Sequence, residues 1–290
     1  MMTKAYLSAF LAGQVSDGRA LLSAAELLAA RVGGLSYSDM TADPALWGSS
    51  LVKATRLLGL SGLILGFDPA LAAAAAVKDD PLEGTGFGIA VEAFSRLVQT
   101  EQEHIGCIAA MAGPLSLAQA IHGDGFPDHL ADLKQVTVSM AEAFCKSRPD
   151  LLLFREGAAL FEGGMGTPQR KAFNTLKNMA SYFSVPVGIF VEGYDSADLP
   201  SLAKLKVPFI LLGADRDGNA PEVDAVRDLA FDVQGIGVPL PFEQTDRARE
   251  LAGEYASQLG DVNYLYTAMN ELTPETDLEA VLALVGDLNG

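Results

Sequence analysis

The 290-residue chain has few of the residues that build disulfide frameworks or soft metal sites: two cysteines and three histidines. Cys107 and Cys145 are too few for a network of disulfides, so a reducing cytoplasm is the predicted compartment. No uninterrupted run of about 18 uncharged apolar residues occurs. The nearest approach, residues 58–77, contains Gly, Asp and Pro in its middle. The sequence therefore predicts no membrane-spanning helix.

Basic residues are also scarce, because 20 Lys and Arg stand against 37 Asp and Glu, giving a formal net charge of −17. Nucleic-acid binding needs clustered Lys and Arg, and anionic membrane surfaces attract the same groups. The composition argues against both kinds of partner. With 49% apolar and 20% charged residues, the chain has enough apolar side chains for a large core.

Several common catalytic motifs are missing. No G-x-S-x-G segment occurs, so nothing supports a Ser-His-Asp hydrolase. His104, His122 and His129 have no metal-ligand spacing with a cysteine, and surface or helix-capping roles are predicted for them. The glycines of residues 84–88 follow no strand pattern, which argues against a phosphate-binding loop.

What the chain does have is a regular alternation of β-rich and amphipathic segments. Many of the β-rich segments are continuous apolar runs, as expected of parallel strands covered on both faces. Helical patterns lie between them, for example at 92–104, 129–147, 169–183 and 243–260. The eight predicted strands are 20–26, 61–68, 105–114, 150–157, 185–193, 207–215, 231–239 and 262–271.

Eight such units without an internal linker predict a single-domain α/β chain over residues 1–290, a (β/α)8 TIM barrel. A doubly wound open sheet is the alternative. The first 13 residues carry a short apolar stretch with a faint likeness to a signal peptide. Because the apolar part is brief and runs into a helically spaced Ala/Leu pattern, we predict an N-terminal helix there.

Acidic residues close six of the eight predicted strands, and in a (β/α)8 barrel these ends surround the active-site mouth. Carboxylates gathered there must be protonated, paired with a base, or bound to a cation. Asp68 and Asp215 have the alternative role of helix caps, whereas Glu caps poorly. Glutamates are therefore the stronger pocket candidates. The six residues are Glu26, Asp68, Glu156, Glu192, Asp215 and Glu271.

Arg155 is the basic residue nearest to these acids, and it directly precedes Glu156. Because side chains alternate along a strand, only one of the two can face the mouth. Arg155 is thus either an outward partner for a helix or an inward clamp for an anion. The segment 162–171 that follows is either a lid over the site or a long turn.

Three segments carry a family resemblance: MAGPLSLAQAI (111–121), GLSGLILGFDPALAAAA (59–75) and NYLYTAMNELTPETDLEAV (263–281). The last keeps a P-x-T-x-x-E core. Together they resemble the uroporphyrinogen decarboxylase superfamily, which also contains corrinoid- and coenzyme M-dependent methyltransferases. The resemblance covers most of the chain and implies the same (β/α)8 barrel.

The functional residues of that superfamily are largely replaced. Zinc-dependent methyltransferases have His-x-Cys-Gly at the fifth strand and a second Cys before a Glu near the end. Here Phe190 and Glu192 stand at the first pair, Asn270 at the second Cys, and Glu271 keeps the Glu. Phenylalanine cannot ligate a metal, so the usual thiolate zinc site is absent. Carboxylates at 192 and 271 suit only a harder ion.

The decarboxylase branch is matched no better. Its arginine-rich segment should lie near residues 20–34, where only Arg31 stands, out of register. Its closing His-Gly pair is Asn270–Glu271 here. Those arginines bind the carboxylates of a tetrapyrrole, which an acidic mouth would repel. A genuine uroporphyrinogen decarboxylase is therefore not expected.

The leading hypothesis is an enzyme of the methyltransferase side, acting on a small methylated molecule. A corrinoid protein or tetrahydrofolate would accept the methyl group. Its catalytic candidates are Glu192, Glu156 and Glu271, where Glu192 or Glu156 with a raised pKa protonates the leaving group. Its substrate-binding candidates are Asp68, Arg155, Asn270, Phe190, Asp215 and Glu26.

Two further hypotheses stay open. One is a decarboxylase or lyase acting on a non-porphyrin carboxylate that Arg155 clamps, and the other is a non-catalytic ligand-binding barrel. A metal near Glu192 would favour the first hypothesis, an inward Arg155 without metal the second, and a mouth plugged by side chains the third. Dimers are common for such barrels, so the sequence is also compatible with a homodimer.

Overall fold

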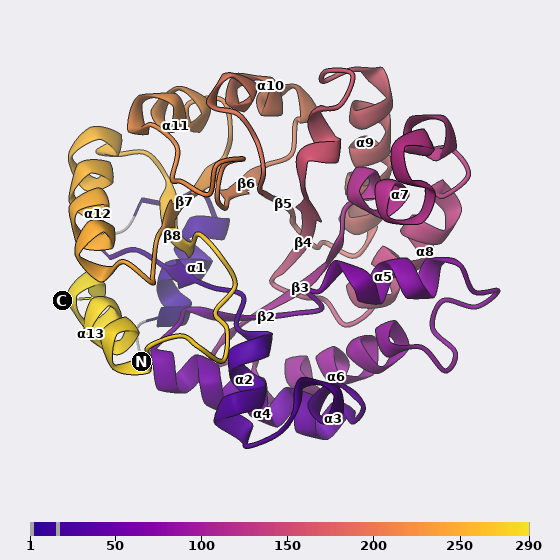
Figure 1. Ribbon diagram of the computed structural model, residues 1–290, viewed down its shortest axis with the longest axis horizontal. Helices are drawn as coiled ribbons and strands as arrows, with labels where there is room; N and C mark the ends of the chain where they lie inside the picture. Colours follow the sequence, from indigo (N-terminus) through magenta and orange to yellow (C-terminus); the bar gives the residue numbers. More distant parts are fainter. Residues whose placement is uncertain (1–2, 16–17, 290) are drawn as a thin grey trace.

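Eight parallel strands surrounded by helices form the molecule (Figure 1). The computed structural model describes residues 3–15 and 18–289. The strands are hydrogen-bonded in the order β1-β8-β7-β6-β5-β4-β3-β2, which confirms the predicted (β/α)8 barrel over the open sheet. They are β1 (Leu21–Leu22), β2 (Gly62–Leu65), β3 (Gly106–Ala112), β4 (Leu151–Glu156), β5 (Val187–Val191), β6 (Phe209–Leu212), β7 (Gly235–Leu240) and β8 (Tyr264–Ala268).

The barrel closes between β1 and β2 through one serine. The backbone N–H of Leu21 donates to Ser61 Oγ at 2.9 Å, and the N–H of Ser61 donates to the Leu21 carbonyl at 2.9 Å. On its other side, β1 pairs with β8, with Leu21 opposite Tyr266. Two hydrogen bonds at Ser61 thus replace a longer β1–β2 ladder.

Helices follow each strand and cover the outside of the barrel. All four helical patterns read from the sequence are helices, and no helix within the described residues is long and apolar enough to cross a membrane. The helices are α1 (Thr3–Leu11), α2 (Glu26–Gly33), α3 (Tyr37–Thr41), α4 (Pro44–Leu58), α5 (Pro69–Ala76), α6 (Gly86–Glu101), α7 (Pro114–His122), α8 (Lys134–Cys145), α9 (Thr167–Tyr182), α10 (Leu199–Leu202), α11 (Val223–Ala230), α12 (Thr245–Leu259) and α13 (Leu278–Asn289). Short 3₁₀ turns are η1 (Gly123–His129), η2 (Ala158–Phe161), η3 (Ser196–Asp198) and η4 (Ala203–Leu205).

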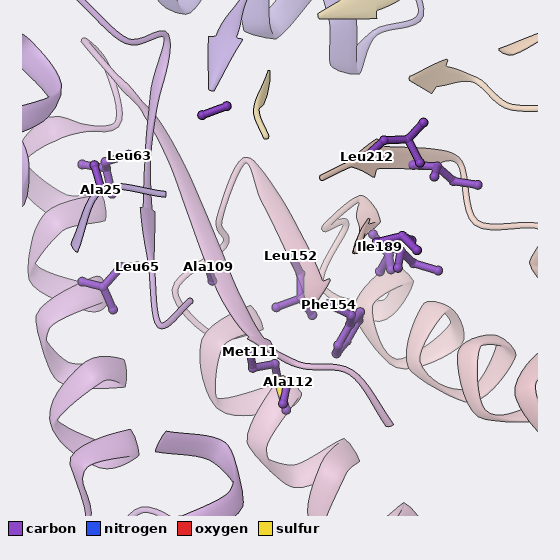
Figure 2. Packing of buried hydrophobic residues seen from close by; sticks show 14 of the residues in the cluster. Ala25, Leu63, Leu65, Ala109, Met111, Ala112, Leu152, Phe154, Ile189 and Leu212 are labelled. Atoms are coloured by element: carbon purple, nitrogen blue, oxygen red, sulfur yellow. The ribbon is translucent and has the colours of Figure 1, made fainter. Parts of the chain in front are cut away.

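The strands alternate their side chains between two apolar cores. Along β4, Leu152 and Phe154 belong to the larger cluster between strands and helices (Figure 2). Leu151 and Leu153 belong to a smaller cluster in the barrel interior. This period of two continues to the end of β4, so residue 155 points inward and residue 156 outward.

Helix α1 plugs the amino-terminal end of the barrel. Leu7 and Phe10 are buried in the interior cluster, and α1 contacts β2, β3 and β8. Glycines begin the strands where α1 packs: a Cβ on Gly106 would collide with Leu7, and one on Gly235 with Phe10. The predicted N-terminal helix is confirmed from Thr3 on, and residues 1 and 2 lie outside the described residues. The carboxyl ends of the strands form the mouth at the opposite end.

Gly106→Ala should lower the free energy of unfolding by about 1–3 kcal/mol, because the added methyl group overpacks the α1 plug. Gly125→Ala is the matched control, since no atom lies within 4 Å of a Cβ built there. Urea unfolding of both variants measures the difference. Equal stabilities for the two variants would show that α1 does not seal the barrel in this way.

Candidate active site at the barrel mouth

A narrow cavity lies at the carboxyl ends of the strands. Its volume is about 10 Å³, room for about one water molecule. Three of the residues predicted from the sequence line it together: Phe190, Asn270 and Glu271. The other lining residues are Leu22, Ser23, Ala24, Ile64, Phe67, Leu211, Thr267 and Ala268. The lining is mostly apolar, and its polar residues are Ser23, Thr267, Asn270 and Glu271.

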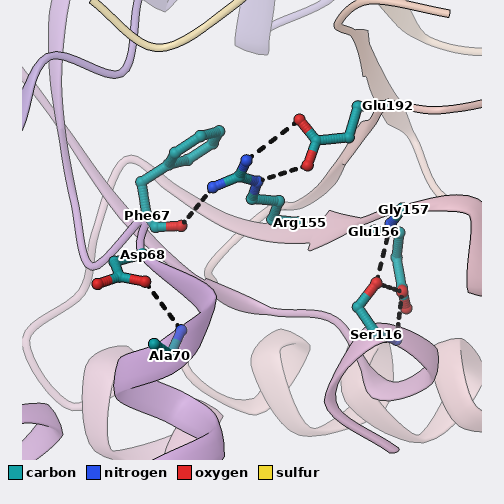
Figure 3. Close-up of polar contacts among 8 residues, drawn as sticks. All are labelled: Phe67, Asp68, Ala70, Ser116, Arg155, Glu156, Gly157 and Glu192. Carbon is teal, nitrogen blue, oxygen red and sulfur yellow. Dashed lines mark hydrogen bonds and ion pairs between the residues drawn. The ribbon is translucent and has the colours of Figure 1, made fainter. Parts of the chain in front are cut away.

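Arg155 points inward, as Figure 3 shows, which settles the choice that the sequence left open. Its Nε donates to Glu192 Oε1 at 2.9 Å and its Nη2 to Glu192 Oε2 at 3.2 Å, a two-pronged ion pair. Its Nη1 donates to the Phe67 carbonyl at 3.3 Å. Glu192 thus balances the charge of Arg155 at the mouth.

Two aromatic rings stand beside this ion pair. The guanidinium carbon of Arg155 lies 4.3 Å from the centre of the Phe67 ring, which is a cation–π contact. Phe67 packs edge-on against Phe190, with 5.1 Å between the ring centres. Gly213 makes room for Phe190, because a Cβ there would lie 2.7 Å from the ring. Rings and ion pair together fill the mouth.

Glu156 lies on the opposite side of β4 from Arg155 (Figure 3). It is fully buried, and its carboxylate accepts from the Leu115 N–H at 3.1 Å and from the Ser116 N–H and Oγ at 2.8 and 2.7 Å. Burial raises the pKa of Glu156 to about 7, against these hydrogen bonds. The structure places this candidate away from the mouth, where it joins β4 to the start of α7.

Glu26 is the first residue of α2 rather than the end of the predicted strand 20–26, which stops at Leu22. Ala, Leu, Glu and Arg, all strong helix formers, dominate the residues that follow. Its buried carboxylate accepts from Trp47 Nε1 and the Gly66 N–H at 3.0 Å each, and from the Phe67 N–H at 2.9 Å. Glu26 therefore fixes the backbone that carries Phe67.

The pKa of Glu26 is raised to about 8. Burial is the largest cause, and the nearby charge of Glu271 adds to it, whereas the three hydrogen bonds act in the opposite direction. Glu26 thus keeps its proton at pH values where an exposed glutamate has lost it. Its carboxyl group lies behind the mouth rather than in the cavity lining.

Glu271 is the acidic residue that lines the cavity. It is half-buried, and its Oε1 accepts from the Leu27 N–H at 3.3 Å. Burial raises the pKa of Glu271 and the charge of Asp68 adds to this, whereas the Leu27 N–H and the Arg155 charge lower it. A carboxyl group with a raised pKa that faces a cavity is suited to general acid catalysis.

Asp68 caps a helix, the alternative role that the sequence allowed for both aspartates, whereas Asp215 caps no helix and holds a turn. Asp68 Oδ1 accepts from the Ala70 N–H at 2.9 Å at the start of α5. Asp215 Oδ1 accepts from the Asp217 and Asn219 N–H groups at 2.9 and 2.7 Å and thereby holds a turn. Asp68 also belongs to the acidic group at the mouth through its charge effect on Glu271. Asp215 is not among the residues that line the cavity.

Tyr37 of α3 is a mouth residue that the sequence did not reveal. Its pKa is raised by burial first, and then by the charges of Glu26, Asp68 and Glu271 and a hydrogen bond with Asp68. No motif marks such a tyrosine, because only the fold brings α3 to the loop after β2. Phe67 was visible in the FDP segment, but its role depends on the position of Arg155.

The donor atoms that its side chains offer decide whether the mouth can hold a metal ion. Among residues 3–15 and 18–289, no group of three or more His, Cys, Asp or Glu side chains is placed to hold a metal ion. Phe190 and Asn270 offer neither thiolate nor imidazole where the zinc-dependent enzymes carry ligands. The residues at this mouth do not fit a zinc ion.

Comparison with known proteins gives a likeness in fold. No protein-family model and no curated protein sequence matches the chain. A methyltransferase from Methanosarcina mazei superposes with a TM-score of 0.76 and 15% identity, covering 99% of this chain and 98% of that one. A B12-independent methionine synthase from Shewanella sp. W3-18-1, in complex with selenomethionine, matches with a TM-score of 0.45 and 11% identity. The match covers 68% of this chain and 66% of that one. The chain therefore shares the barrel fold of the methyltransferase over nearly its full length.

Proposed function

We propose that this chain is a methyl-transfer enzyme that demethylates a small molecule at the barrel mouth. The observation that carries the proposal is Glu271, a half-buried carboxyl group with a raised pKa that lines the mouth cavity. It stands at the end of the barrel where enzymes of this fold place their active sites. The full-length likeness in fold to a methyltransferase supports the same reaction class.

In the proposed step, the bond between the methyl group and a substrate nitrogen or oxygen breaks as the acceptor nucleophile bonds to the methyl carbon. The proton of Glu271 moves to the ether oxygen or to the lone pair of a neutral amine nitrogen, so the leaving group departs as a neutral alcohol or amine and not as an anion. Asp68 and Glu192 give the mouth negative charge beyond that of Arg155, which favours the positive charge that the nitrogen of a neutral methylated amine gains with this proton. The rings of Phe67 and Phe190 would contact the apolar part of the substrate.

The methyl acceptor is proposed to be a corrinoid protein or tetrahydrofolate that approaches from outside the barrel. The cavity of about 10 Å³ has room for about one water molecule, so substrate and acceptor would both bind above it, on the outer side of the mouth. The chain's own residues bind the substrate and move the proton. A cytoplasmic location and a homodimer belong to the same proposal.

Arg155 favours a second candidate function, decarboxylation or lyase chemistry on a small carboxylate. A substrate carboxylate would replace Glu192 on the inward guanidinium, with the same two-pronged geometry. The filled mouth is also a feature of the third hypothesis, a non-catalytic ligand-binding barrel.

The experiment that separates these functions is an assay on two substrate panels. Methylated amines and aryl methyl ethers are incubated with the protein and either cob(I)alamin or tetrahydrofolate, and small carboxylates are incubated with the protein alone. The proposal predicts a demethylated product and a methylated acceptor from the first panel. If the second panel released carbon dioxide and no substrate were demethylated, the proposal would be wrong and decarboxylation would be the function. If neither panel were turned over, the remaining hypothesis would be the non-catalytic ligand-binding barrel.

A further inference from the structure

A larger cavity lies outside the barrel, between η1, α8 and α9. Its volume is about 420 Å³, within the roughly 300–1,000 Å³ of small-molecule sites. Helices α8 and α9 lie side by side in this part of the ring (Figure 1). Its apolar lining includes Leu133, Val138 and Leu176. We call this space the α8/α9 cavity.

The charges that line the α8/α9 cavity are positive on balance. Lys134 and Lys171 both line it, against one acidic residue, Asp128. The lining thus carries a net charge of +1 in a protein of net charge −17. Neither lysine takes part in an ion pair within the described residues. Their ammonium groups are therefore available to an anion.

The groove between α4 and α6 shows the contrast. It is larger, about 770 Å³, and Arg56 lines it, but Arg56 pairs with Glu101 at 2.6 Å. Lys53 there donates to the Val32 carbonyl at 2.8 Å. The cationic side chains of this groove already have partners, so they are less available to bind an anion.

We propose that the α8/α9 cavity is a second binding site, distinct from the mouth, for a small organic anion with an apolar body. The anionic group would bind Lys134 and Lys171, and the body would cover the apolar wall. Both helices begin at this cavity, so their positive dipole ends add to the attraction for a negative charge. A medium-chain carboxylate has both parts, and the site does not depend on the reaction proposed for the mouth.

The test uses decanoate as the anion and decanol as its uncharged analogue, with binding measured by isothermal titration calorimetry. Lys134→Ala/Lys171→Ala should weaken decanoate binding about tenfold and leave decanol unchanged. Lys78→Ala/Lys204→Ala removes the same charge from exposed positions that do not line the cavity, and should change neither affinity. Equal decanoate affinity in the two double variants would overturn the proposal.

Two single variants locate the ligand. Ala172→Trp fills the α8/α9 cavity and should abolish binding of decanoate and decanol, with folding checked by circular dichroism. Asn270→Trp crowds the barrel mouth and should leave both affinities unchanged. Loss of decanoate binding in Asn270→Trp alone would place the carboxylate at the mouth and contradict the inference. Because it reports binding only, this outcome is independent of whether methyl transfer occurs.

Discussion

Replacing Glu26 with alanine should lower the free energy of unfolding by about 3–5 kcal/mol at pH 5. The change leaves the Trp47 indole N–H and the Gly66 and Phe67 backbone N–H groups without their buried acceptor. Each buried donor left unsatisfied costs about 1–3 kcal/mol. The same loss frees the loop after β2, so the Phe67 ring should no longer hold its position at the mouth.

The size of this effect should depend on pH in a definite direction. The pKa of Glu26 is about 8 in the native state and near 4.5 when exposed, so between these values the native state binds the proton that the unfolded chain releases. The stability that Glu26 contributes is complete below pH 4.5 and declines as pH rises to about 8. A shift of this size corresponds to at most about 5 kcal/mol. The cost of Glu26→Ala should therefore approach zero near pH 9.

Urea unfolding of the wild type and Glu26→Ala at pH 5, 7 and 9 measures this dependence. Glu83→Ala, an exposed glutamate, is the control and should change stability little at any pH. Glu156 titrates similarly in both proteins, with a native pKa of about 7, and cancels in the difference. If the loss of stability caused by Glu26→Ala grew with pH, Glu26 would instead be buried as a stabilised carboxylate.

Replacing Glu271 with glutamine should lower kcat for demethylation by about 10²–10⁴-fold, the usual contribution of a general acid. Glutamine keeps the shape and can still accept from the Leu27 N–H, but it has no acidic proton. Substrate binding should change less than kcat, because the proton moves only as the methyl bond breaks. Glu275→Gln, an exposed neighbour, is the matched control.

The pH profile separates a proton donor from a structural residue. Glu271 acts in its protonated form, so kcat of the wild type should fall as pH rises through its raised pKa. Glu271→Gln should lose this decline and keep a low, flat rate. If Glu271→Gln retained wild-type kcat, or if the decline persisted in the variant, the acid role would be refuted.

The architecture followed from local patterns. The eight strands were visible because buried parallel strands are continuous apolar runs, and the helices because their apolar residues recur at three- and four-residue steps. Strand ends were less exact: β1 has only two residues, and the Glu26 assigned to its end begins α2. Helix propensity and the two hydrogen bonds at Ser61 decide where β1 ends. Neither of them can be read from the apolar pattern of a strand.

The site was only partly predictable. Alternation along β4 required Arg155 and Glu156 to face opposite ways, but the direction of each depended on register within the barrel. Partners such as Ser116 for Glu156 lie 40 residues away and carry no motif. Tyr37 reaches the acidic group through a short helix that no periodicity marks. The clustering of Phe190, Asn270 and Glu271 could be predicted, because all three lie near strand ends and these ends meet at one mouth.

Reaction of the substrate at the barrel mouth can be followed directly by NMR with a ¹³C-labelled methyl group. A methylated substrate from the turnover panel is incubated with the acceptor and with wild type, Asn270→Trp or Asn174→Trp. The account predicts that the label moves to the acceptor with the wild type and with Asn174→Trp, which alters an exposed position on α9. It predicts that the label stays on the substrate with Asn270→Trp. Transfer by Asn270→Trp at the wild-type rate would contradict the account.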